Sequence, residues 1–460
     1  MRESRTAPCL TVTLLVVKVL SQRHPGSDDG RSRTGIGRSA AMLGVASLCI
    51  GSISFAFIFV GSRVLSDEAM ADLLSYWAIM NTTVLSMIIP LETLAPRILS
   101  GATAKRAVGD GRVALVVHGG GLGVVGGVVS VLIYLADSSG GATMLAIAGL
   151  AYCVALGIWS GMRSHLVGSG LFGDALGLAA VTTVVALASI AAVYLADLGS
   201  GALLLTGIAA AYMAGLIGWW LTNRHPAERV VGDTPRQRIS LGDQNYRMLV
   251  TLIGVTFATL ILNNGGLVFA GFLDVEARTI VVYAAALNLV RIPLMLINNV
   301  TPPINLKMAE LAATEQLPEL RTLAVRTLAG FTSVLVIGLV ATWFLGPFFV
   351  RILVGGGSGN VDGRLVALVL LGEGLIWLTV LPRIVCVALG NRRAMIAAWI
   401  VGLIGFLTWM LLPIDNEWKV VGGPIVGGLT TLVVGLALAG GLLRQSSRQP
   451  DASKPTFLSA

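Results

Sequence analysis

An arginine stands at position 291, in the middle of an otherwise apolar stretch. The helical period puts Asn288 and Asn298 on the same face as Arg291. An ionisable side chain at mid-bilayer costs about 2.5 to 3.5 kcal/mol, so one that persists usually faces a cavity or a partner. A guanidinium has the fork geometry to bind a pyrophosphate or another anionic head group. We therefore predict a cavity site for an anion here; the alternative is an ion pair or hydrogen-bonded strut between helices.

Two further polar side chains share a face in an earlier apolar stretch. Asn81 and Glu92 are separated by three helical turns. Asn81 is a candidate cavity residue. Glu92 is a candidate for coupling transport to a proton or cation. Alternatively, it neutralises an arginine or accepts hydrogen bonds near a kink made by Pro90 and Pro96.

A third stretch carries a stripe of amides and hydroxyls, formed by Thr256, Thr259, Asn263 and Asn264. Such groups can line a path for sugars, and we name Thr259 and Asn263 as cavity candidates, although hydrogen bonds between helices are their commoner role. Glu373 is the second ion-coupling candidate. It ranks before Asp174 and Arg383, because those two lie near predicted span ends.

The motifs of enzymes and metal sites are missing from the sequence. It contains no Walker A loop and no HExxH, CxxC or GxSxG pattern. The glycine run GGGLGVVGG at 119–127 lies inside an apolar stretch, where close helix packing explains it better than phosphate binding. We expect no catalytic residue, no metal and no cofactor.

The composition indicates that lipid is the solvent of these stretches. Hydrophobic residues make up 55% of the chain and charged residues 12%, and the mean hydropathy is +0.83. A soluble domain could not carry this composition. The net charge of +8 does not indicate nucleic-acid binding, because the basic residues cluster in loops between the apolar segments.

A membrane helix needs roughly 20 apolar residues. This criterion predicts an all-α membrane protein with about twelve transmembrane helices in two sets of six. The predicted spans are 40–61, 71–98, 113–136, 142–162, 172–196, 201–222, 247–271, 277–304, 324–345, 365–389, 394–413 and 420–443.

The distribution of Lys and Arg predicts the orientation, because cytoplasmic loops retain these residues. With both termini in the cytoplasm, the outer side receives only Arg63, Arg278, Arg351, Arg364 and Lys419. We therefore expect a multi-pass protein of the cytoplasmic membrane. The aromatic residues Tyr76, Trp77, Trp219, Trp220 and Trp418 fall at predicted interfaces and are interpreted as a belt.

The predicted domains follow from the spans. Residues 1–39 are a disordered basic tail and 40–222 an N-terminal lobe. A cytoplasmic basic linker at 223–246 leads to a C-terminal lobe at 247–443 and a cytoplasmic tail at 444–460. Asp67, Tyr76 and Pro96 fall on Asp274, Tyr283 and Pro303 at a shift of 207 positions, which indicates a parallel duplication of the six-helix unit.

These features resemble a known family of transporters. A basic N-terminus precedes a first helix with a short acidic loop (GSRVLSDEAMADLLSYWAIMNTT, 61–83) and a long second helix ending in Pro-Arg (PLETLAPRIL, 90–99), and the second half repeats the theme. This resembles the Wzx-like polysaccharide flippases of the MOP superfamily, which also contains the MATE branch. The resemblance covers most of 40–443.

The resemblance implies a flippase rather than an enzyme. Alternating access of two lobes would move a lipid-linked oligosaccharide or polysaccharide precursor, of the polyprenyl pyrophosphate type, to the outer leaflet. Membrane lipids are then partners, and cell-envelope glycosyltransferases are further candidates.

Two other functions remain open. A cation-coupled small-molecule exporter of the MATE type would prefer acidic residues in the cavity, yet the first and seventh spans contain none. A membrane glycosyltransferase or polymerase could use Asp67 and Glu68, but the outer loops leave little room for a folded site.

Overall fold

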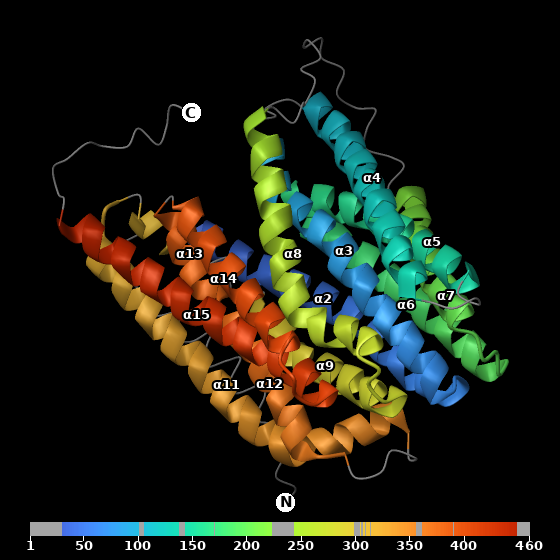
Figure 1. Cartoon of the computed structure of the whole chain (residues 1–460). Helices are drawn as coiled ribbons and strands as arrows, with labels where there is room; N and C mark the ends of the chain where they lie inside the picture. Colours follow the sequence, from blue (N-terminus) through green and yellow to red (C-terminus); the bar gives the residue numbers. More distant parts are fainter. Residues whose placement is uncertain are drawn as a thin grey trace, which may run out of the picture. The chain divides into compact units, whose positions relative to one another are not determined.

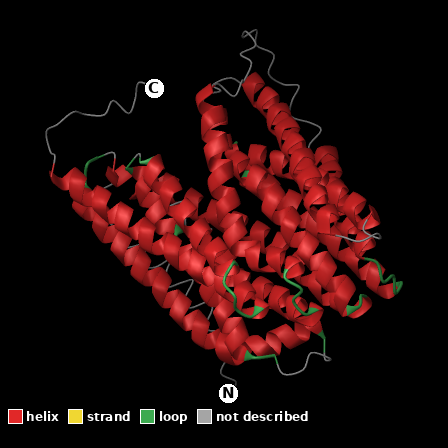
Figure 2. Cartoon of the chain, in the orientation of Figure 1, coloured by secondary structure: helices red, strands yellow, loops and turns green. Residues whose placement is uncertain are grey.

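The computed structural model describes residues 30–100, 105–137, 143–169, 171–222, 243–298, 304, 307–308, 310–312, 314–355, 361–389 and 391–448. These residues form helices joined by short turns, and the described part of the chain contains no strand (Figures 1 and 2). Contacts divide the chain after residue 41, and the packing and the pocket described below lie within residues 42–460.

The helices of the first half are α2 (Gly30–Val64), α3 (Asp67–Ser100), α4 (Lys105–Asp137), α5 (Thr143–Gly168), α6 (Phe172–Leu195) and α7 (Gly201–Thr222). Those of the second half are α8 (Asp243–Phe272), α9 (Ala277–Asn298), α11 (Leu317–Val354), α12 (Gly363–Leu378), α13 (Val380–Ala388), α14 (Arg392–Met410) and α15 (Asn416–Arg448).

Eleven helical segments in the described residues are long and apolar enough to cross a membrane. Each matches one of the twelve predicted spans, and α9 occupies the place of the remaining one. The helices α4 and α11 expose many large apolar side chains, whereas α5 and the α12–α13 segment are largely buried. Exposed apolar helices around buried ones are what lipid as solvent requires, so the chain is a multi-pass membrane protein.

Several predicted boundaries change. Helix α2 begins at Gly30, inside the predicted N-terminal tail, and α8 begins at Asp243, inside the predicted linker. Most of that linker, at 223–242, lies outside the described residues, as do 1–29 and 449–460. The tenth predicted span is one crossing made of two helices, which meet at Thr379. Pro382 explains the break, because it has no N–H and its ring clashes with the carbonyl four residues earlier.

The two halves repeat the same packing. In the first half α3, α4 and α5 contact one another, and α7 contacts α5 and α6. In the second half α9, α11 and α12 contact one another, and α15 contacts α12 and α14. The pairs match when helices are counted in order through each half, as a parallel duplication predicts.

Glycines let α4 and α5 approach until their backbones touch. A Cβ added at Gly157 would meet the carbonyl oxygen of Gly119 and lie 2.9 Å from the Cα of Gly123. The glycine run at 119–127 therefore packs helices, which confirms that interpretation of the sequence.

The close approach predicts the effect of a single methyl group. We expect Gly157→Ala to lower the free energy of unfolding by about 1 to 3 kcal/mol, because backbone must move to admit it. The matched control is Gly121→Ala on α4, where an added Cβ meets nothing within 4 Å. Thermal unfolding in detergent should separate the two variants, and equal melting temperatures would contradict the packing argument.

Candidate functional site

A narrow pocket lies between the two halves. Its empty space, including open solvent at its mouth, is about 330 Å³, but the volume available to the centres of water-sized molecules is only about 10 Å³. The first half contributes α2 and α3, and the second half contributes α8 and α9. The lining residues are Ser54, Phe57, Ile58, Leu74, Trp77, Ala78, Asn264, Leu267, Leu287, Asn288 and Arg291. The first half thus supplies an apolar and aromatic wall, and the second half supplies most of the polar groups.

Arg291 is the one charged residue in this lining. Its Nη2 donates to the side-chain oxygen of Asn264 at 2.8 Å and to the backbone carbonyl of Asn263 at 3.1 Å. The same nitrogen lies 3.1 Å from Oε1 of Glu373 on α12. The Arg291 side chain is 25% exposed and that of Glu373 only 5%. Arg291 is therefore held from behind by Glu373, while part of its guanidinium faces the pocket.

The structure therefore contains the features that both interpretations of Arg291 require. The ion pair between α9 and α12 is the structural alternative that the sequence left open, and the pocket is the environment that anion binding requires. Glu373 contacts the site through Arg291 and does not line the pocket. A carboxylate in that position fixes the direction of the guanidinium fork.

The other candidate cavity residues of α8 and α9 differ in how they relate to the pocket. Asn288 lines the pocket and donates to the carbonyl of Ala284 within α9. Asn263 takes part through its backbone, whereas its side-chain oxygen is buried without a hydrogen-bond partner among the described residues. Thr259 is not in the lining, and its hydroxyl donates to Val255 within α8. The side chain of Asn298 lies outside the described residues.

Glu92 is placed away from the pocket. Its Oε1 lies 2.9 Å from Nη1 of Arg163 on α5, and both side chains are about one-quarter exposed. This is the neutralised arginine that the sequence allowed as an alternative. Asn81 is half-buried on α3, one turn beyond Ala78 of the pocket lining.

The aromatic residues of α3 do not form an interfacial belt. Tyr76 is fully buried in the first half, where its hydroxyl donates to the carbonyl of Ala146. Trp77 lines the pocket and stacks on Phe57 with ring centroids 4.6 Å apart. The belt interpretation was wrong for both, because each side chain packs against protein.

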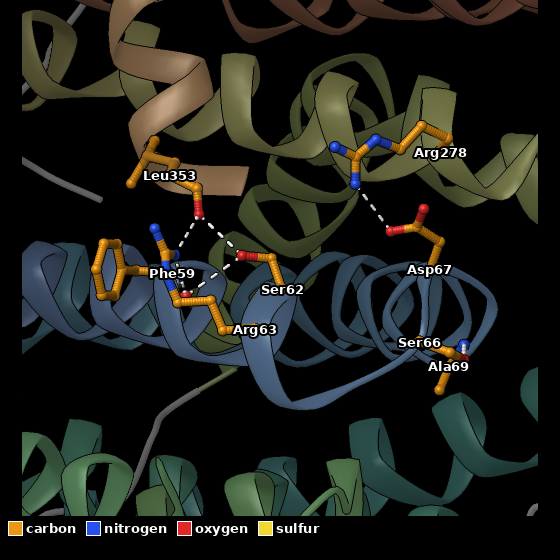
Figure 3. Close-up of polar contacts among 8 residues, drawn as sticks. All are labelled: Phe59, Ser62, Arg63, Ser66, Asp67, Ala69, Arg278 and Leu353. Atoms are coloured by element: carbon orange, nitrogen blue, oxygen red, sulfur yellow. Dashed lines mark hydrogen bonds and ion pairs between the residues drawn. The ribbon is translucent and has the colours of Figure 1, made fainter. Parts of the chain in front are cut away.

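A cluster of polar contacts joins the two halves beside the start of α3 (Figure 3). Arg63 at the end of α2 donates to the carbonyls of Ile352 and Leu353, at 2.9 and 3.2 Å, and Ser62 also donates to Leu353 at 2.9 Å. These carbonyls belong to the last turn of α11, where no N–H group of the same helix is available to bond them. The negative end of the helix dipole lies at the same place. Arg63 therefore caps α11 from the other half.

An ion pair stands next to this cap. Nη1 of Arg278, near the start of α9, lies 2.9 Å from Oδ1 of Asp67 in the first turn of α3 (Figure 3). Asp67 also lies where the α3 dipole favours a negative charge. Arg63 and Arg278 are two of the residues that the charge pattern assigned to the outer side. Together, the cap and the ion pair form a latch of side chains between the halves, which the sequence analysis did not predict.

No protein-family model matches the chain, and no curated protein matches it. Solved structures do share its fold. An inward-facing multidrug resistance MATE family transporter of the MOP superfamily is 10% identical, with a TM-score of 0.60 over 89% of this chain and 96% of that one. A mutant of the Vibrio cholerae MATE transporter VcmN is 14% identical, with a TM-score of 0.62 over 90% and 97%.

A third similar structure differs in its description. It is a MOP superfamily transporter from Pyrococcus furiosus, for which reverse polarity of the binding pocket suggests a different function. It is 13% identical, with a TM-score of 0.60 over 90% of this chain and 96% of that one. With two halves of repeated packing and these similarities over most of its length, the chain has the fold of the MATE transporters of the MOP superfamily.

Proposed function

We propose that this chain is a membrane transporter that flips a lipid-linked oligosaccharide or polysaccharide precursor across the cytoplasmic membrane. The observation that carries the proposal is the single positive charge, Arg291, in a pocket between two halves of a MATE-like fold. An arginine partly open to a cavity at membrane depth suits an anionic group, such as the phosphates that join a saccharide to its lipid. Rocking of the halves around the pocket would carry the head group across while the lipid chain stays in the bilayer.

The charge of the pocket favours this substrate over a cationic drug. A cation exporter gains from carboxylates in the cavity, whereas Glu373 is almost fully buried behind Arg291 and Glu92 pairs with Arg163. The Pyrococcus furiosus protein is a case in which pocket polarity is taken to indicate a different function within this fold. The small-molecule exporter remains the second candidate, supported by the multidrug resistance MATE transporter among the similar structures.

A transport assay in proteoliposomes separates the two functions. The substrate is the mixture of lipid-linked saccharides extracted from cells depleted of this protein, and translocation is followed by loss of access to an external glycosidase. We expect the wild-type protein to translocate these lipids and not to move ethidium along a proton or sodium gradient. Ethidium movement without saccharide translocation would favour the exporter, and absence of both activities would overturn the proposal.

A further inference from the structure

The partly exposed residues of α3 follow one face of the helix. They are Trp77, Asn81, Leu85, Ile89 and Glu92, whereas every other residue described between 73 and 91 is buried except Met87. Steps of three and four residues keep this stripe on one side of the helix. The stripe begins in the pocket at Trp77 and runs along α3 away from the latch.

Trp77 is held in a fixed orientation at the start of the stripe. Its ring stacks on Phe57 of α2 at an interplanar angle of 26°, and the centroid of Tyr152 on α5 lies 5.0 Å away. It is the one residue between 73 and 80 that is not buried. A large aromatic side chain that is held by two neighbouring rings and partly exposed to the pocket can contact a sugar ring at little entropic cost.

Asn81 lies one turn further along the same stripe. Within the described residues its amide has no hydrogen-bond partner, and neither has the buried hydroxyl of Thr82, whereas Thr83 bonds to Ser130 and Ser86 donates to the carbonyl of Thr83. An unpaired amide at membrane depth is costly unless water or a ligand reaches it. An amide supplies both donors and an acceptor, which match the hydroxyl groups of a sugar.

We propose that Trp77 and Asn81 form a saccharide subsite, in which the indole stacks on a pyranose ring and the amide hydrogen-bonds its hydroxyl groups. The inference rests on the proposed function and adds a division of roles. The first half binds the sugar through α3, and the second half binds the phosphates through Arg291. Because the pocket is narrow in this conformation, a sugar ring enters when the halves separate, and the two binding elements then act on adjoining parts of one substrate.

The test compares two ligands that differ only in the sugar. They are the extracted lipid-linked saccharide and the same lipid pyrophosphate without sugar, each bound to purified protein in detergent. Wild-type protein should bind the sugar-bearing lipid more tightly. Trp77→Leu and Asn81→Ala should each reduce this preference roughly 3- to 10-fold and leave the affinity for the sugar-free lipid unchanged, because each variant loses only contacts to the sugar. Trp77→Phe should restore most of the preference.

Controls separate this subsite from packing and from the proposed function. Trp343→Leu, at a 51% exposed position on α11, should change neither affinity. Equal weakening of both ligands by Trp77→Leu would indicate a structural role and overturn the subsite, as would an unchanged preference. A wild-type protein that translocates the lipid-linked saccharide but binds both ligands equally would remove the subsite and leave the flippase. Failure of translocation itself would remove the function.

Discussion

Arg291→Ala is expected to abolish transport and also to destabilise the protein by about 3 to 5 kcal/mol. The second effect follows from Glu373, whose side chain is 5% exposed and whose charge is balanced by Arg291. Removing one partner of a buried ion pair leaves an uncompensated charge in a medium of low dielectric constant. The sequence alone suggests the loss of transport but not the loss of stability, so abundance in the membrane must be measured alongside activity.

A paired variant isolates the function from the fold. Arg291→Gln combined with Glu373→Gln removes both charges and keeps hydrogen-bonding groups facing one another, so its melting temperature in detergent should stay close to that of the wild type. Its affinity for inorganic pyrophosphate should fall about tenfold or more, because a charged hydrogen bond to the anion is lost. The single variant Glu373→Gln serves as the control that retains Arg291. Normal transport by the paired variant would refute an arginine-bound head group.

The membrane fold could be predicted because its main signals are local. Apolar length and the distribution of Lys and Arg are read within each segment, and every segment identified as a possible crossing corresponds to a predicted span. The predicted orientation rests on the same charges and stays a prediction. The break between α12 and α13 was missed, although Pro382 is a local signal, because neighbouring helices often let a proline remain inside a membrane helix.

The partners of the charged residues could not be predicted, because they are set by which helices meet. Arg291 pairs with Glu373 on α12, and Glu92 pairs with Arg163 on α5. Both pairs join the second helix of a half to its fourth. The sense of the charges is reversed between the halves, and at the shift of 207 positions Glu92 falls about two turns beyond Arg291, so the duplicated architecture repeats which helices are joined and not the residues that join them. Composition alone cannot distinguish such a strut from a binding group.

The role of Trp77 was missed for a related reason. An aromatic residue near a span end matches an interfacial belt, and the sequence gives no sign of what surrounds it. In the structure it is braced by Phe57 and Tyr152 and opens into the pocket. What separates a belt residue from one that lines a pocket is tertiary packing around the ring.

The latch is expected to break during transport. Arg63 and Ser62 bind the end of α11, and Asp67 binds Arg278, so both contacts join α2 and α3 of one half to helices of the other. Each contact is partly exposed, and exposed ion pairs contribute only about 0 to 1 kcal/mol. Contacts of this strength can break and re-form, which is what the proposed separation of the two halves during transport requires.

Covalent closure of the latch should therefore stop transport. Cysteines introduced as Asp67→Cys and Arg278→Cys replace an ion pair with a nitrogen–oxygen distance of 2.9 Å, so a short reducible bifunctional thiol reagent can join them. The background carries alanine at the four native cysteines. We expect translocation of lipid-linked saccharide to fall to the level of empty liposomes after cross-linking and to recover after reduction. Each single-cysteine variant, treated in the same way, should retain activity. Full transport by the cross-linked protein would show that the halves need not separate at this end, and alternating access around the pocket would then be excluded.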